Sequence, residues 1–219
     1  MNNRIFSKNN FLLAVTACLK RCSAALFCDG VVAEKNLNID ASSNFAGVVS
    51  DLLHENNLDV RKINGIITAS GPGSFTGIRI SQSFAKGMAF SLKIPAVSVD
   101  YFGVIDSIYQ QKYQGGDFSR LIVIESDKNQ LYFRYYDGKR IVHGVDSHEN
   151  IQSYIEKNNI QIIIGDASEK LEKNLSVRID DFRNARHLLT FSRLLSAESQ
   201  IIPLYINASG SSTIQQALT

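Results

Sequence analysis

Short apolar runs separated by polar turns dominate the first half of the chain. They predict strands at residues 11–17, 22–27 and 31–37. Asp29-Gly30 lies between the second and third runs and predicts a hairpin turn, because glycine accepts a positive φ at little cost. The pattern then predicts a helix at 42–57, a strand at 63–69, a helix at 78–92 and a strand at 96–99.

The helix predicted at 42–57 rests on a regular spacing of apolar residues. They recur at intervals of three and four, which places them on one face of a helix. Ser42 or Ser43 is expected to cap its first turn. The apolar face consists of Phe45, Val48, Val49, Leu52 and Leu53.

The second half repeats the order of elements found in the first. Asp137-Gly138 predicts a second hairpin turn, and the polar stretch 110–119 with Gly115-Gly116 is expected to join the halves. The pattern therefore predicts a duplicated α/β chain with halves at 1–112 and 113–219. The elements expected in the second half are strands at 121–124, 131–136 and 141–145, a helix at 148–158, a strand at 160–164 and a helix at 184–197.

Composition fits a globular protein and narrows the function classes. Of 219 residues, 44% are hydrophobic and 20% are charged, which excludes a disordered, collagen-like or coiled-coil chain. The net charge of +2 is too small for a chain that grips nucleic acid on its own. No run approaches the roughly 20 apolar residues that span a bilayer, so no membrane attachment is expected.

The N-terminal region and the cysteines bear on location. Arg4 and Lys8 precede a short apolar run that resembles a signal peptide, but its removal would take away the first predicted strand. A cytoplasmic location is therefore expected. Cys18, Cys22 and Cys28 are predicted to be buried free thiols, because they are odd in number and no cluster of Cys or His accompanies them.

The most specific stretch joins the strand at 63–69 to the helix at 78–92. Its three glycines allow a tight turn and leave backbone amides unobstructed, and free amides at a helix N-terminus attract an anion. The alternative is a turn whose glycines serve packing alone, and local physics does not separate the two. Ser74 and Thr76 are the expected helix caps. The candidate anion-binding residues are Gly71, Gly73, Ser74, Thr76 and Gly77.

Known phosphate-binding and nucleophile motifs do not fit this loop. Gly77 is followed by Ile78 rather than by the Lys-Ser/Thr pair of a P-loop. The glycine spacing misses the dinucleotide-binding fingerprint by one residue, and a nucleophile elbow would need Gly-x-Ser-x-Gly at a shorter spacing. No cofactor is therefore predicted.

The helix predicted at 78–92 has two apolar faces, whereas a surface helix needs only one. Such a helix is either buried between layers, or it packs one face on the core and the other on a helix of a partner. Ile80, Phe84 and Gly87 lie on one face. The other face carries Ala85, Met88, Ala89 and Leu92.

The glycine loop also carries a family resemblance. The chain closely resembles the TsaB family, formerly called YeaZ, in the nonamer Gly71-Pro72-Gly73-Ser74-Phe75-Thr76-Gly77-Ile78-Arg79. These proteins are dimerisation subunits of the bacterial tRNA threonylcarbamoyladenosine (t6A) system. The resemblance continues in Ile94-Pro95-Ala96-Val97-Ser98-Val99 and in Ile202-Pro203-Leu204-Tyr205-Ile206-Asn207. Residues 12–27 are similar to the family's first hairpin, and residues 100–200 match only in the order of elements.

The resemblance implies an actin-like ATPase (ribonuclease H-like) fold with two β-β-β-α-β-α halves and a non-catalytic scaffold role. A TsaD-like subunit would hold the metal and add threonylcarbamoyl to N6 of adenosine 37 in tRNAs that read ANN codons. A TsaE-like ATPase would join the pair, and tRNA would be met through the complex. This chain would bind the TsaD-like subunit through the helices at 42–57 and 78–92. The interface residues expected from this are Phe45, Val49, Leu52, Ile80, Phe84, Ala85, Gly87 and Met88.

Three departures from the family pattern weaken any nucleotide or metal site. Thr16-Ala17 stand where the family has Asp-Thr, Ala41 stands where a His commonly precedes the first long helix, and Glu125-Ser126-Asp127 replace an Asp-Ala-Arg-like segment. A family-type metal site also needs a His-x3-His pair, which does not occur, so no metal and no catalytic residue is predicted. The four histidines, His54, His143, His148 and His187, are expected at the surface.

Two alternatives remain open. One is an enzyme of the same fold, either a small-molecule kinase or ATPase or a glycoprotease-like peptidase. A kinase would need carboxylates for Mg²⁺ at strand ends, and Asp100 and Asp106 are the nearest candidates. The other is a homodimer that pairs through the same helix faces when no partner is present. Because the chain is nearly neutral, most tRNA phosphate contacts are expected from the assembled complex.

Overall fold

The structure is a computed structural model. It describes residues 11–19, 21–28, 31–37, 44–113, 119–126, 129–136, 141–158, 160, 162–171, 175–196 and 198–206. Contacts divide the described chain into two compact units. One unit comprises the residues up to Tyr101 together with Arg183–Tyr205, and the other comprises Phe102–Phe182 and, among the later described residues, Ile206. The units differ from the expected halves 1–112 and 113–219 chiefly because this late segment belongs to the first unit.

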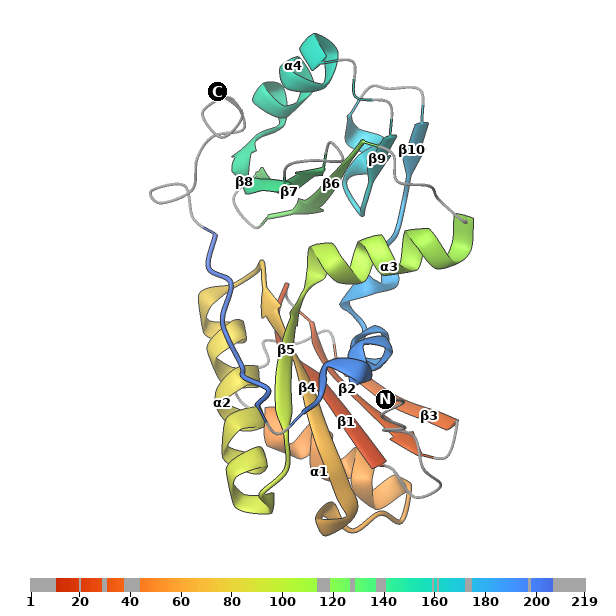
Figure 1. Cartoon of the computed structure of the whole chain (residues 1–219), viewed down its shortest axis with the longest axis vertical. Helices are drawn as coiled ribbons and strands as arrows, with labels where there is room; N and C mark the ends of the chain where they lie inside the picture. Colours follow the sequence, from red (N-terminus) through yellow and green to blue (C-terminus); the bar gives the residue numbers. More distant parts are fainter. Residues whose placement is uncertain are drawn as a thin grey trace. The chain divides into compact units, whose positions relative to one another are not determined.

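The first unit is built on a five-stranded mixed sheet of order β3-β2-β1-β4-β5 (Figure 1). The first three strands are antiparallel neighbours, and β1, β4 and β5 run parallel. All five strands were predicted from the apolar runs. Their bounds are β1 (Phe11–Thr16), β2 (Cys22–Cys28), β3 (Val31–Leu37), β4 (Ile63–Gly71) and β5 (Ala96–Asp100).

Two helices cover one face of this sheet. They are α1 (Phe45–Glu55) and α2 (Phe75–Leu92), with a short 3-10 helix, η1 (Val60–Lys62), before β4. Leu13 and Val15 of β1 contribute to the core beneath the helices, because alternate residues of a strand point to the same face. The apolar face predicted for 42–57 is buried in this core, which confirms the helix.

The other face of the sheet is covered by η4 (Ala185–Leu194), a 3-10 helix (Figure 1). The prediction of a helix at 184–197 belonging to the second half is therefore wrong in helix type and in location. Ser23 on β2 accepts a hydrogen bond from the amide of Ala185 at 2.8 Å. An added Cβ on Gly65 of β4 would lie 2.7 Å from the end of the Leu195 side chain, so the segment after η4 packs closely on this face of the sheet.

The second unit repeats the strand order of the first, β8-β7-β6 followed by β9 and β10. This confirms the predicted duplicated α/β class. Between β9 and β10 there is only a short 3-10 helix, at the position that α2 has in the first unit. The sequence analysis did not predict α3 or β10. The elements are α3 (Tyr101–Tyr113), β6 (Arg120–Glu125), β7 (Gln130–Tyr136), β8 (Ile141–Ser147), α4 (His148–Asn158), β9 (Ile162–Ile164), η2 (Ser168–Lys170), β10 (Leu175–Val177) and η3 (Asp181–Arg183).

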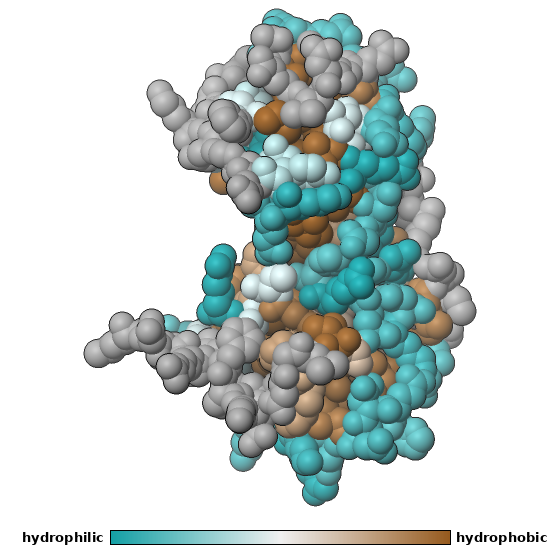
Figure 2. Space-filling model, turned by 90° about the vertical axis from the view of Figure 1, so that its right-hand side faces the viewer, coloured by the Kyte–Doolittle hydropathy of each residue, from teal (hydrophilic) through white to brown (hydrophobic). Residues whose placement is uncertain are grey.

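Several sequence predictions lie outside the described residues. These are the hairpin dipeptides Asp29-Gly30 and Asp137-Gly138, the cap at Ser42 or Ser43, the family position Ala41 and the joining pair Gly115-Gly116. None of the described helices is long and apolar enough to cross a membrane. Figure 2 shows one face, on which hydrophobic surface is visible among hydrophilic residues.

Candidate functional site

The glycine loop connects the end of β4 to the start of α2. Gly71 ends the strand with φ +119°, the Gly71–Pro72 peptide bond is cis, and Gly73 has φ +154°. Ser74 is the N-cap of α2, and its side-chain oxygen accepts a hydrogen bond from the amide of Gly77 at 3.0 Å. The helix therefore begins at Phe75, three residues earlier than predicted. Ser74 is confirmed as a cap, whereas Thr76 lies exposed inside the first turn.

Two glycines of the loop are required by close packing inside the unit. An added Cβ on Gly77 would lie 2.0 Å from the carbonyl oxygen of Ala17, and one on Gly71 would lie 2.5 Å from that of Leu204. The amide of Gly77 is already bonded to Ser74. These contacts favour the packing interpretation of the loop over the anion cradle.

A late segment of the chain closes over this loop. The amide of Leu204 donates a hydrogen bond to the carbonyl oxygen of Ser70 at 2.7 Å. Ser98 of β5 donates to the carbonyl oxygen of Ile202 at 2.9 Å and accepts from its amide at 2.8 Å. Ile202 and Leu204 of the family-like segment are thereby held against β5 and β4, while Asn207 lies outside the described residues.

A buried hydroxyl pair occupies the end of β1, where the family pattern has Asp-Thr. The Thr16 and Tyr101 side-chain oxygens are 2.5 Å apart, and both residues are fully buried. Burial raises the pKa of Tyr101 well above its ordinary value. Each hydroxyl is therefore neutral and partnered by the other.

All three cysteines are free thiols as predicted, and the predicted burial is confirmed for two of them. Cys18 and Cys22 are buried and free, and Cys28 is half-buried and free. Burial raises the pKa of Cys18 to about 12 and that of Cys22 to about 11. Neither thiol is a nucleophile near neutral pH, because the reactive form is the thiolate.

The eight expected interface residues separate into two groups. Phe45, Val49, Leu52 and Ala85 are at most 5% exposed and belong to the chain's own core. A partner cannot touch these four on the folded surface, so they are removed from the expected contact surface. Ile80, Phe84 and Met88 are half-buried, and Gly87 is exposed.

Phe84 joins the two helices. Its ring meets that of Phe45 edge-on, with centroids 5.1 Å apart. Gly87 follows one turn later on α2, and nothing lies within 4 Å of a Cβ added there. The α1–α2 pair therefore presents a surface of Ile80, Phe84, Gly87 and Met88, which we call the helix-pair surface.

Asp106, one of the two carboxylates named for a kinase alternative, is held in an ion pair with an arginine. Asp106 lies in α3, and its two oxygens accept hydrogen bonds from Arg120 at 2.6 and 2.7 Å. Among the described residues, no three His, Cys, Asp or Glu side chains come together as a metal site. His143 is exposed on β8, and half-buried His148 begins α4 with Nε2 3.9 Å from Glu125.

Comparison with solved structures defines the class of fold. The chain is similar to YeaZ from Pseudomonas aeruginosa, with a TM-score of 0.68 and 22% sequence identity. The alignment covers 90% of this chain and 100% of that one. Together with the repeated strand order of the two units, this likeness confirms an α/β fold of two similar halves.

Sequence comparison then gives the family. The family model described as TsaD: tRNA N6-adenosine threonylcarbamoyltransferase matches residues 30–179. The tRNA threonylcarbamoyladenosine biosynthesis protein TsaB of Buchnera aphidicola subsp. Acyrthosiphon pisum is 24% identical, over 89% of this chain and 83% of that protein. TsaB of Escherichia coli K12 is 25% identical, over 71% of this chain and 68% of that protein. The chain belongs to the family that this model describes, and the relatives that it matches over most of its length are TsaB proteins.

Proposed function

We propose that this chain is a non-catalytic dimerisation subunit in tRNA threonylcarbamoyladenosine biosynthesis. It binds a TsaD-like catalytic subunit through the helix-pair surface, a TsaE-like ATPase joins them, and the complex adds threonylcarbamoyl to N6 of adenosine 37 in tRNAs that read ANN codons. The chain works in the cytoplasm and meets tRNA through the complex.

The biosynthetic role is supported by the TsaB relatives, and the observation that carries the proposed interface is the open position at Gly87. Glycine in the middle of a helix costs about 0.5–1 kcal/mol relative to alanine, so it needs a reason. No neighbour within the described chain supplies one, because a Cβ at this position meets nothing within 4 Å. Beside half-buried Phe84, an exposed glycine allows the backbone of a partner helix to approach closely.

The interior near the glycine loop supports a scaffold rather than a catalyst. Thr16 and Tyr101 satisfy each other within the core, and buried Cys18 is a neutral thiol. The glycines at 71 and 77 are engaged in packing against Leu204 and Ala17. The anion site expected at Gly73, Ser74 and Thr76 stays a prediction.

The test mixes the chain with a purified TsaD-like subunit and measures complex formation by size-exclusion chromatography. Gly87→Glu places a charge in the proposed interface without touching the core, so the variant is expected to fold and to lose the complex. Lys157→Glu on the exposed end of α4 is the matched control and should bind normally. Binding by Gly87→Glu equal to that of the control would show that the helix-pair surface is not the interface.

The same preparation tests the other possibilities. A concentration-dependent dimer of the chain alone, abolished by Gly87→Glu, would support the homodimer when no partner is present. Micromolar binding of Mg-ATP to the isolated chain by calorimetry would instead favour the enzyme alternative. In both experiments, the isolated chain is expected to show no threonylcarbamoyl transfer activity.

A further inference from the structure

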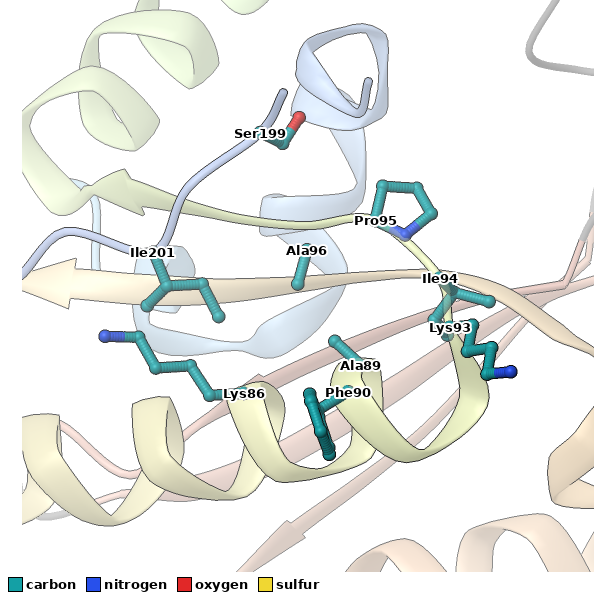
Figure 3. Close-up of a pocket in the computed structure, with 9 residues that line it drawn as sticks. All are labelled: Lys86, Ala89, Phe90, Lys93, Ile94, Pro95, Ala96, Ser199 and Ile201. Atoms are coloured by element: carbon teal, nitrogen blue, oxygen red, sulfur yellow. The ribbon is translucent and has the colours of Figure 1, made fainter. Parts of the chain in front are cut away.

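A pocket of about 440 Å³ lies on the flank of α2 that faces away from α1. Phe84 marks the α1 flank, and Lys93 follows it by nine positions, which is two and a half helical turns and hence the opposite side. Figure 3 shows Lys86 and Phe90 of α2 at this pocket, together with Pro95 directly before β5, Ala96 at the start of β5, and Ile201 of the segment that follows η4. The pocket is separate from the helix-pair surface.

The pocket has an apolar lining and a positively charged rim. Ala89, Ile94 and Ile201 contribute apolar surface. Phe90 is 88% exposed, the highest value among the large hydrophobic side chains of the described residues. Exposed aromatic rings beside a hollow are typical anchors of protein interfaces, because their burial by a partner removes a large apolar area from water.

The two lysines on the pocket rim can form ion pairs with a partner. Lys86 and Lys93 both line the pocket, and within the part of the chain that the structure describes neither has an ion-pair partner. A segment that carries carboxylates would complement both ammonium groups, whereas a basic segment would be repelled.

Lys93 also occupies an unfavourable backbone position. It is the C-cap of α2 with φ +56° and ψ +43°, the left-handed region that glycine adopts without a steric penalty. A lysine at this position costs stability that a glycine would not. Residues held in such conformations often serve a function, and here the side chain lies on the pocket rim.

We propose that this pocket binds a short acidic segment of a partner protein. One large apolar side chain of the segment seats against Phe90 and Ile201, and carboxylates on either side of it meet Lys86 and Lys93. The volume falls in the range of about 300–1,000 Å³ that is usual for ligand pockets and leaves room for one large side chain and its neighbours.

The test selects random 12-residue peptides displayed on phage against the intact chain, with counter-selection against Lys86→Glu/Lys93→Glu. The expected peptides carry one large apolar residue flanked by Asp or Glu. Synthesised with a fluorophore, they should bind with micromolar Kd, about tenfold more weakly to the double Glu variant and nearly unchanged to Lys86→Arg/Lys93→Arg. Amide shifts in NMR should map to the pocket residues. Higher salt should weaken binding.

Two further variants separate binding from folding. Lys93→Gly should weaken peptide binding while it raises the melting temperature by about 2 °C, because glycine relieves the left-handed residue. Gly87→Ala should bind the peptides normally, since residue 87 does not line the pocket and the variant adds no charge. Selection of neutral or basic peptides, no enrichment, or equal binding to the Lys86→Glu/Lys93→Glu variant would overturn the proposal. A dimer of the chain abolished by that variant would also overturn it and would identify a second copy as the occupant.

Discussion

Gly77 lies so close to Ala17 that a Cβ added to it would be 2.0 Å from the Ala17 carbonyl oxygen. The first turn of α2 is therefore seated directly on the end of β1. This contact involves backbone atoms, which have little freedom to move aside. It fixes where the helix that carries Phe84 and Gly87 begins.

Gly77→Ala is expected to destabilise the chain by about 2 kcal/mol or more, because the added methyl overpacks against backbone. Urea unfolding followed by circular dichroism measures the change. Gly87→Ala is the matched control on the same helix. Nothing lies near its added Cβ, so the variant should gain about 0.5–1 kcal/mol from helix propensity alone. Equal effects of the two substitutions would contradict the close contact at Gly77.

Much of the fold could be predicted from the sequence, because apolar periodicity reports local structure. The runs at 11–17 and 63–69 gave the central strands, and the spacing at 42–57 gave α1. The helix α3 (Tyr101–Tyr113) was missed, although Phe102, Val104 and Ile105 are fully buried, because the polar stretch that follows was taken as a linker. Periodicity also does not state which sheet receives a segment, so the placement of 184–197 was wrong.

The candidate site was less accessible to sequence reasoning. Apolar spacing identifies the inner face of a helix but does not tell whether the chain's own core or a partner covers it. Val49 and Ala85 were therefore assigned to a partner, whereas the structure buries both. The pocket beside Phe90 also could not be foreseen, because Ile201 reaches it from a segment more than 100 positions away in the chain.

Asp106→Ala is expected to destabilise the chain by about 1–3 kcal/mol. Arg120 is only 8% exposed, and removal of the carboxylate would leave its buried guanidinium without this charge partner. Asp180→Ala removes an exposed partner of Arg178 and should cost less than about 0.5 kcal/mol. Unfolding by urea at neutral pH measures both. A cost for Asp106→Ala as small as that for Asp180→Ala would show that the ion pair contributes little.

Stability should fall as the pH rises above about 9. The folded state raises the pKa of Cys18 from 9.0 to about 12, so between these values the unfolded thiol is ionised while the folded one keeps its proton. The unfolded state is then favoured by about 1.4 kcal/mol per pH unit for this thiol. In Cys18→Ala, the free energy of unfolding measured in urea should decline less steeply between pH 9 and 10.5. A decline as steep as that of the unaltered chain would assign the effect to other groups, among them Cys22.

Ser98→Ala should loosen the segment that closes over the glycine loop. The Ser98 hydroxyl both donates to and accepts from the backbone of Ile202, so its removal breaks two hydrogen bonds at once. With each bond contributing about 1 kcal/mol, hydrogen exchange at the Ile202 amide should accelerate by at least about tenfold. Thr190→Ala, which removes an exposed hydroxyl bonded to His187 in η4, is the control and should leave that amide unchanged. Ile201 lines the pocket beside Phe90, so Ser98→Ala should also weaken the binding of the acidic peptides. The TsaD-like subunit should still bind to this variant. Unchanged protection at Ile202 would mean that other contacts, such as that of Leu204 with Ser70, hold the segment.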